Sequence, residues 1–92
     1  MELQQTFGMV VRALREERDL TQQQLAENAN LERNYISLIE LGKSCPSICV
    51  LFKLCKGLGV STPFLMARVE EFIQSLDNIQ NTEKGVPPTG CQ

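Results

Sequence analysis

Residues 20–43 read LTQQQLAENANLERNYISLIELGK, and this stretch predicts two short amphipathic helices joined by a tight turn. Thr21 followed three residues later by Gln24 is the pattern of a capping box at a helix start. Asn30 tolerates the left-handed turn conformation, and Gly42 marks the end of the second helix. Each helix carries one apolar stripe: Leu25, Ala26 and Ala29 in the first, and Leu31, Ile36 and Ile39 in the second. Because the small side chain of Ala26 lets two helices cross closely, the pattern predicts helix-turn-helix geometry.

Helical periodicity predicts three further helices around this pair. Together with the pair, at about 22–28 and 33–41, they make five expected helices. The three further ones are a first helix at about 3–18, a fourth capped by Ser47, and a fifth from Ser61 or Thr62 to Leu76. Their expected buried positions are Phe7, Val10 or Val11, Leu14 and Arg18; Ile48, Leu51, Phe52, Cys55 and Leu58; and Leu65, Val69, Phe72, Ile73 and Leu76. Gly57 and Gly59 are expected to close the fourth helix. The chain is therefore predicted to be one all-α domain, residues 1–76, followed by a flexible tail, residues 77–92.

Composition excludes several classes of protein. The 92 residues suffice for one domain, and no apolar run approaches the ~18 residues that span a bilayer. An acidic residue at position 2 and the lack of a basic segment argue against a secretory signal, so we expect a cytoplasmic protein. The net charge is −2, but residues 1–60 are neutral, with seven basic and seven acidic side chains.

Catalytic chemistry is also disfavoured. The chain has no histidine, which excludes Ser-His and Cys-His pairs, and it has no glycine-rich phosphate loop after a strand. The acidic pairs Glu16-Glu17 and Glu70-Glu71 occupy adjacent helical positions that point in different directions. We therefore predict neither an enzyme nor a cofactor.

Four cysteines remain to be explained: Cys45, Cys49, Cys55 and Cys91. Their spacing is not that of a zinc ribbon, and without a secretory signal a disulfide framework is not expected. We interpret them as small apolar residues in or near a helix, and no metal site is predicted. A thiol-based sensor is the alternative, and it would require Cys45 and Cys49 to be exposed and reactive.

Residues from about Phe7 to Val60 resemble the lambda-repressor-like (Xre/Cro family) helix-turn-helix domain of bacterial and phage regulators. FGMVVRALREERDLTQQQLAENANLERNYISLIELGK and PSICVLFKLCKGLGV carry the resemblance, and NLERNYISLIE is similar to the controller proteins of restriction–modification systems. The resemblance is a specific signal of this family because of the combined spacing of Gln22, Leu25-Ala26, Ile36-Ser37, Glu40, Gly42 and Pro46. The resemblance implies a compact five-helix DNA-binding domain. It also implies a salt bridge between Arg15 on the first helix and Glu40 on the third.

The second helix of a helix-turn-helix lies in the DNA major groove. With Ile36 and Ile39 facing the core, the outward positions of this helix would meet DNA. Arg33 suits a bidentate contact to guanine and Asn34 a contact to adenine, whereas Leu38 suits either a thymine methyl or packing against Leu41. The hydroxyl groups of Tyr35 and Ser37 suit a contact to a base or a phosphate. Gln22, at a helix N-terminus, and Lys43 suit contacts to phosphate. The predicted DNA-binding residues are Gln22, Arg33, Asn34, Tyr35, Ser37, Leu38 and Lys43.

Apolar side chains beside the core stripe of the fourth helix predict a partner surface. Four residues of the fifth helix are also spaced as a short coiled-coil seam, part of which must close the monomer core. The predicted homodimer interface comprises Cys49, Val50, Leu65, Val69, Phe72 and Leu76.

The leading hypothesis is a sequence-specific transcriptional regulator that binds double-stranded DNA as a homodimer, on a pseudo-palindromic operator. We expect neither a membrane partner nor a small-molecule ligand. The alternative is a protein-interaction module, antitoxin-like or anti-regulator, that uses the same fold. Acidic charge and the apolar fourth helix favour this alternative, whereas Arg33, Asn34 and Gln22 favour DNA.

Overall fold

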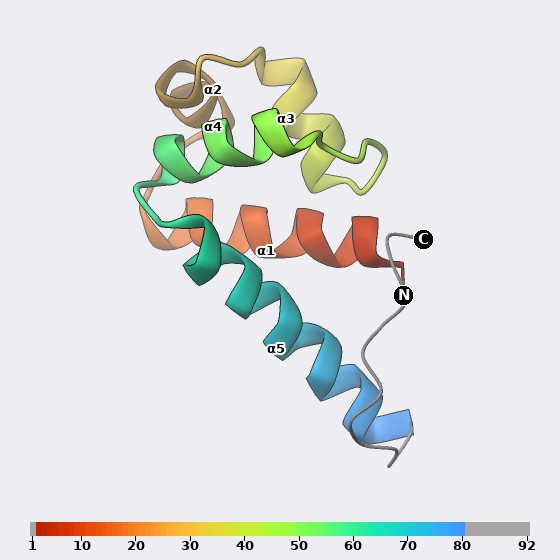
Figure 1. Cartoon of the computed structure of the whole chain (residues 1–92). Helices are drawn as coiled ribbons and strands as arrows, with labels where there is room; N and C mark the ends of the chain where they lie inside the picture. The colour runs from red at the N-terminus through yellow and green to blue at the C-terminus, as the bar shows by residue number, and fades with distance from the viewer. Residues whose placement is uncertain (1, 81–92) are drawn as a thin grey trace.

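The computed structural model describes residues 2–80, with side chains up to residue 75, and this part of the chain contains five helices and no strand. The helices are α1 Leu3–Glu17, α2 Gln22–Ala29, α3 Arg33–Glu40, α4 Ile48–Leu58 and α5 Thr62–Gln80. α2, α3 and α4 gather on one side of α1, while α5 crosses the other side and extends past it (Figure 1). The predicted five-helix, all-α fold is confirmed. α5 continues to Gln80, past the predicted helix end, and the rest of the predicted tail, residues 81–92, lies outside the described residues.

The helix ends follow from local hydrogen bonds that the sequence predicts. The Gln24 backbone N–H donates to Thr21 Oγ1 over 3.0 Å, and the Thr21 N–H donates to Gln24 Oε1 over 2.9 Å, which completes the capping box. Asn30 ends α2 with a φ of 57°, and Gly42 follows α3 with a φ of 76°. Ser47 caps α4 by accepting the Val50 N–H over 3.2 Å. All of these predicted boundaries are confirmed.

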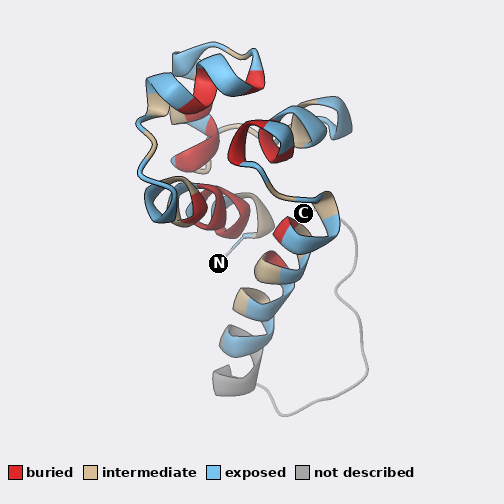
Figure 2. Cartoon of the chain, turned by 90° about the vertical axis from the view of Figure 1, so that its left-hand side faces the viewer, coloured by how far each residue is buried: buried red, intermediate tan, exposed pale blue. Residues whose placement is uncertain are grey.

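The hydrophobic core collects side chains from all five helices, and Figure 2 shows the buried segments facing one another. It comprises Phe7, Val10, Val11, Leu14, Leu25, Ala26, Ala29, Ile36, Ile39, Leu54, Cys55, Leu58, Leu65 and Val69. Val10 and Val11 are both buried, so the alternative between them is resolved in favour of both. Arg18 follows the end of α1 and is exposed, so its predicted core position is wrong.

Two glycines let helix pairs approach closely. A Cβ on Gly8 would collide with the carbonyl oxygen of Ile39 and lie 2.9 Å from that of Glu40, so α1 meets the backbone of α3 at this point. A Cβ on Gly57 would lie 2.9 Å from the Cβ of Ala29, where α4 crosses α2. Gly57 is therefore a buried residue inside α4, and the prediction that it closes the helix is wrong; Gly59, with a φ of 75°, does so.

The buried face of α4 differs from the predicted stripe. Cys55 and Leu58 are buried as expected, but Ile48 and Phe52 are 71% and 57% exposed, and Leu54 is fully buried instead. α4 is apolar on more than one side, so helical periodicity alone fits two different stripes. The close contact between Gly57 and α2 determines which of these sides faces the core.

α5 packs its first half against α1. Leu65 and Val69 are 0% and 1% exposed and complete the monomer core. The prediction that these two side chains belong to the dimer interface is therefore wrong. Arg68 ties the same turns to α1 by donating to Glu17 over 2.9 Å, and Phe72 is half-buried. The side chain of Leu76 lies outside the described ones. Within residues 2–80, no single helix is long and apolar enough to cross a membrane, and α4 with α5 meets that criterion only as a pair bent by 100°.

Candidate nucleic-acid interface

α3 presents two contrasting sides. Ile36 and Ile39 are 0% exposed and face the core, whereas Arg33 and Asn34, in the first turn of the helix, are exposed. Apolar residues at i and i+3 fix the rotation of the helix, and the polar first turn is then directed into solvent. α3 therefore has the side-chain arrangement that a groove-reading helix requires.

Three other positions of α3 were predicted to contact DNA. Leu38 is 42% exposed, and Leu41, just after the helix, is 59% exposed, so neither side chain is shielded by the other. Tyr35 and Ser37 are half-buried, and Tyr35 packs against the hydrophobic core. Leu38 thus belongs to the outward face, whereas Tyr35 and Ser37 lie at its edges.

The polar groups of this face are unengaged. Within residues 2–80, the side chains of Arg33, Asn34 and Lys43 form no hydrogen bond or ion pair with another described residue. Lys43 is exposed in the loop after α3, where its backbone N–H donates to the Leu38 carbonyl over 2.9 Å. The charges of Arg33 and Lys43 and the amide of Asn34 are therefore available to a ligand.

A buried ion pair holds α3 in place. Arg15 Nε donates to Glu40 Oε2 over 2.7 Å and Arg15 Nη2 to Glu40 Oε1 over 3.2 Å, with side chains only 12% and 3% exposed. The hydrogen bond to Glu40 raises the pKa of Arg15 above its ordinary value. This pair, which the family resemblance implied, is confirmed.

Gln22 joins the same ion pair, which sequence reasoning did not find. Its Nε2 donates to Glu40 Oε1 over 3.0 Å, so the first residue of α2 is tied to the last residue of α3. The residues lie eighteen positions apart, and no periodicity connects them. The sequence offered one hint of this contact: Gln22 and Glu40 both belong to the set of spaced residues that carries the family resemblance.

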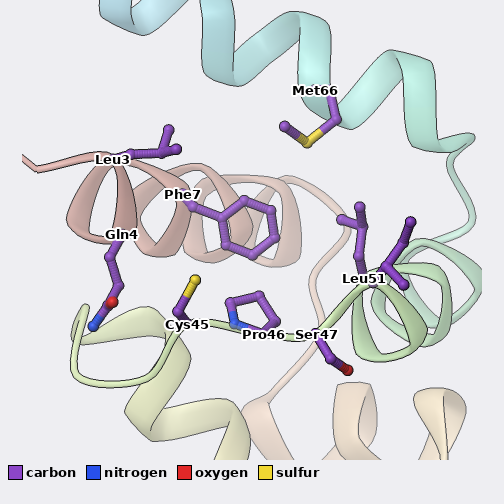
Figure 3. A pocket seen from close by; sticks show the side chains of 9 residues that line it. Leu3, Gln4, Phe7, Cys45, Pro46, Ser47, Leu51 and Met66 are labelled. Atoms are coloured by element: carbon purple, nitrogen blue, oxygen red, sulfur yellow. The ribbon is translucent and has the colours of Figure 1, made fainter. Parts of the chain in front are cut away.

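The loop between α3 and α4 borders an apolar pocket of about 300 Å³ (Figure 3). Gln4 anchors the loop by donating its Nε2 to the Gly42 carbonyl over 2.8 Å. The lining residues are Leu3, Gln4, Phe7, Cys45, Pro46, Ser47, Ile48, Leu51 and Met66. In Figure 3 the Phe7 ring and the Cys45 sulfur face the pocket from opposite sides. Ile48 both lines this hollow and belongs to the exposed side of α4.

The cysteines differ in their surroundings. Cys45 and Cys49 are exposed, whereas Cys55 is buried, and this burial raises the pKa of the Cys55 thiol. Cys49 and Cys55 thus lie in α4 and Cys45 just before it, as interpreted, but of these three only Cys55 is buried. Among the described residues there is no group of three potential metal ligands.

Residues 11–65 match the helix-turn-helix family model. The chain belongs to this family of DNA-binding transcriptional regulators. Among its relatives, the immunity repressor protein of Bacillus phage phi105 is 46% identical over 55 residues, which cover 60% of this chain but 38% of the repressor.

Controller proteins are similar over most of their own length. Control protein C.MunI of a Mycoplasma species is 38% identical over 66 residues, which cover 71% of this chain and 89% of that protein. The crystal structure of the wild-type restriction-modification controller protein C.Esp1396I superposes with a TM-score of 0.76 at 33% identity, covering 79% of this chain and 95% of that one. The resemblance to Xre-family regulators and to controller proteins is thus confirmed.

Proposed function

We propose that this regulator binds a pseudo-palindromic DNA operator as a homodimer, with one α3 helix in each of two major-groove segments. The observation that carries the proposal is the exposed, unengaged edge of Arg33 and Asn34 above the buried Ile36 and Ile39. In a helix-turn-helix, the N-terminal residues of the second helix reach the base edges.

Sequence would be read by three side chains of α3. Arg33 would donate two hydrogen bonds to O6 and N7 of guanine, and Asn34 would pair with N6 and N7 of adenine. Leu38, which is 42% exposed, offers apolar contact to a thymine methyl group. Each bidentate pair contributes about 1–3 kcal/mol of discrimination against a wrong base.

Phosphate contacts would position the protein on the duplex without reading sequence. Gln22 opens α2, where the positive end of the helix favours an anion. Lys43 contributes a charge, and the hydroxyl groups of Tyr35 and Ser37 are suited to either phosphate or base. Since residues 1–60 carry no net charge, we expect weak non-specific binding and a strong dependence on the operator sequence.

The dimer would form through the exposed apolar side of α4. Ile48 and Phe52 are large apolar side chains left in solvent on one side of α4, and the exposed Cys49 borders this side, whereas the half-buried Val50 lies farther around the helix and packs against the core. Such a surface usually marks a contact with another protein. A two-fold axis through it would let the projecting side chains of each copy meet the hollow beside Ile48 in the other. Two α3 helices about 34 Å apart would then match half-sites one DNA turn apart.

Selection from a random pool of DNA duplexes tests DNA reading. The parent protein should enrich an inverted repeat, and the double variant Arg33→Ala/Asn34→Ala should enrich nothing. Arg33→Ala alone should weaken binding by about 1–3 kcal/mol and relax one position per half-site, whereas Lys43→Ala should weaken binding evenly and flatten its salt dependence. Without enrichment by the parent, the exposed side of α4 would instead favour the protein-interaction module.

Sedimentation equilibrium tests the dimer. Phe52→Ser removes the aromatic ring from the exposed side of α4 and should shift the protein toward monomer at micromolar concentration. Lys53→Ser alters the next residue, which is also exposed, and serves as the control that should remain dimeric. A monomeric parent protein would rule out the interface.

A further inference from the structure

Glu40 lies where three helices meet, and its carboxylate is almost closed off from solvent. It belongs to α3, but it accepts two N–H groups of Arg15 from α1 and one of Gln22 from α2. Arg15 is itself held, because its Nη1 donates to the Leu20 carbonyl over 2.7 Å. The carboxylate is thus a fixed acceptor, and its position does not depend on a bound ligand.

This fixed acceptor determines the orientation of the Gln22 amide. A carboxylate can only accept, and within a glutamine amide only the nitrogen donates, so the nitrogen must face Glu40. The NH2 group carries two hydrogens, and Glu40 Oε1 accepts one of them over 3.0 Å. Within residues 2–80 no acceptor binds the second hydrogen, and the Gln22 side chain is partly exposed.

We propose that Glu40 is a positioning residue for DNA binding, acting through Gln22. By holding one N–H of the amide, the carboxylate keeps the other directed outward, ready for a backbone phosphate. Glu40 does not touch DNA, and Arg15 balances its negative charge. The inference rests on the proposed function, in which Gln22 contacts a phosphate, and it adds the group that prepares this contact. An amide ordered before binding loses less freedom when the phosphate arrives.

A double-mutant cycle on the selected operator, measured by fluorescence anisotropy, tests the coupling. Gln22→Ala should weaken binding about tenfold, the scale of one hydrogen bond to a charged group. Glu40→Gln, which leaves one acceptor oxygen instead of two, should weaken binding several-fold alone. Combined with Gln22→Ala it should cause no further loss. An equal loss in both backgrounds would show that Glu40 acts only through the fold, and it would overturn the proposal.

Salt dependence and a neighbouring residue provide two controls. Gln22 is uncharged, so Gln22→Ala should lower affinity for matched and mismatched operators alike without changing the slope of affinity against salt. Gln23 is exposed on the same turn and donates to Glu27 over 3.1 Å on its own helix. Gln23→Ala should leave DNA affinity unchanged, and a loss equal to that of Gln22→Ala would contradict the assignment.

NMR of the Gln22 side-chain amide keeps the test open if Glu40→Gln does not fold. In the free parent protein, one of the two amide protons should show the shift of a hydrogen-bonded proton, and operator DNA should move the other. If both protons resemble those of Gln23, the proposal fails. Failure of the parent to select any DNA would remove the proposed function itself, whereas DNA binding without coupling between Gln22 and Glu40 would remove only this inference.

Discussion

Replacing Arg15 by methionine would test what the buried ion pair contributes to stability. Arg15→Met retains much of the aliphatic stem but removes both N–H groups from Glu40 and one from the Leu20 carbonyl. The Glu40 carboxylate, with a side chain 3% exposed, would keep only the N–H of Gln22. Removing one partner of a buried pair costs about 3–5 kcal/mol, a large share of the roughly 5–15 kcal/mol that stabilises a typical domain.

Thermal and urea unfolding, followed by circular dichroism, would measure this loss. At about 4–8 °C per kcal/mol for a domain of this size, the melting temperature should fall by at least about 12 °C. Arg12 supplies the control on the same helix, because its 3.2 Å contact with Glu16 joins side chains that are 61% and 56% exposed. Arg12→Met should lower the free energy of unfolding by about 0–1 kcal/mol, and high salt should abolish this small loss. Equal losses for the two variants would refute the reasoning.

Three further predictions concern packing, pH and thiol reactivity. Gly8→Ala should lower the melting temperature although alanine favours helices, because the new Cβ would collide with the Ile39 carbonyl; an unchanged or higher value would contradict the close crossing of α1 and α3. Arg68 lowers the pKa of Glu17 below its ordinary 4.5, so the pair should stabilise the fold above that pH and lose this effect as the pH falls. In urea titrations, the free energy of unfolding of Arg68→Gln should therefore depend less on pH than that of the parent. Iodoacetamide should label the exposed Cys49 well before the buried Cys55, whose pKa is raised; comparable rates followed by mass spectrometry would contradict that burial.

Helix starts were predictable because they depend on neighbouring residues. Thr21 and Gln24 form a capping box within one turn, and Ser47 caps α4 through a residue three positions away. The face of α4 was not predictable in the same way. Ile48 and Phe52 match the helical period as well as Leu54 does, and the choice depends on a crossing with α2 that lies far away in the sequence.

Sequence reasoning likewise predicted one part of the candidate DNA-binding face and missed another. The exposure of Arg33 and Asn34 followed from the buried isoleucines on their own helix. The role of Gln22 within the ion pair of Glu40 did not, because it requires the relative placement of α1, α2 and α3. Side-chain direction is a local property of a helix, whereas a hydrogen bond between helices is a property of the assembled fold.

The two sides of α3 are independent of each other in energy. Ile36, Ile39 and Glu40 hold the helix in the domain, whereas the outward side chains of Arg33 and Asn34 contribute nothing to that attachment. Exchanging the outward pair should alter stability by no more than about 0.5 kcal/mol, as for other unattached surface residues. This fold can therefore acquire a new target sequence in small steps, each of which leaves a folded protein.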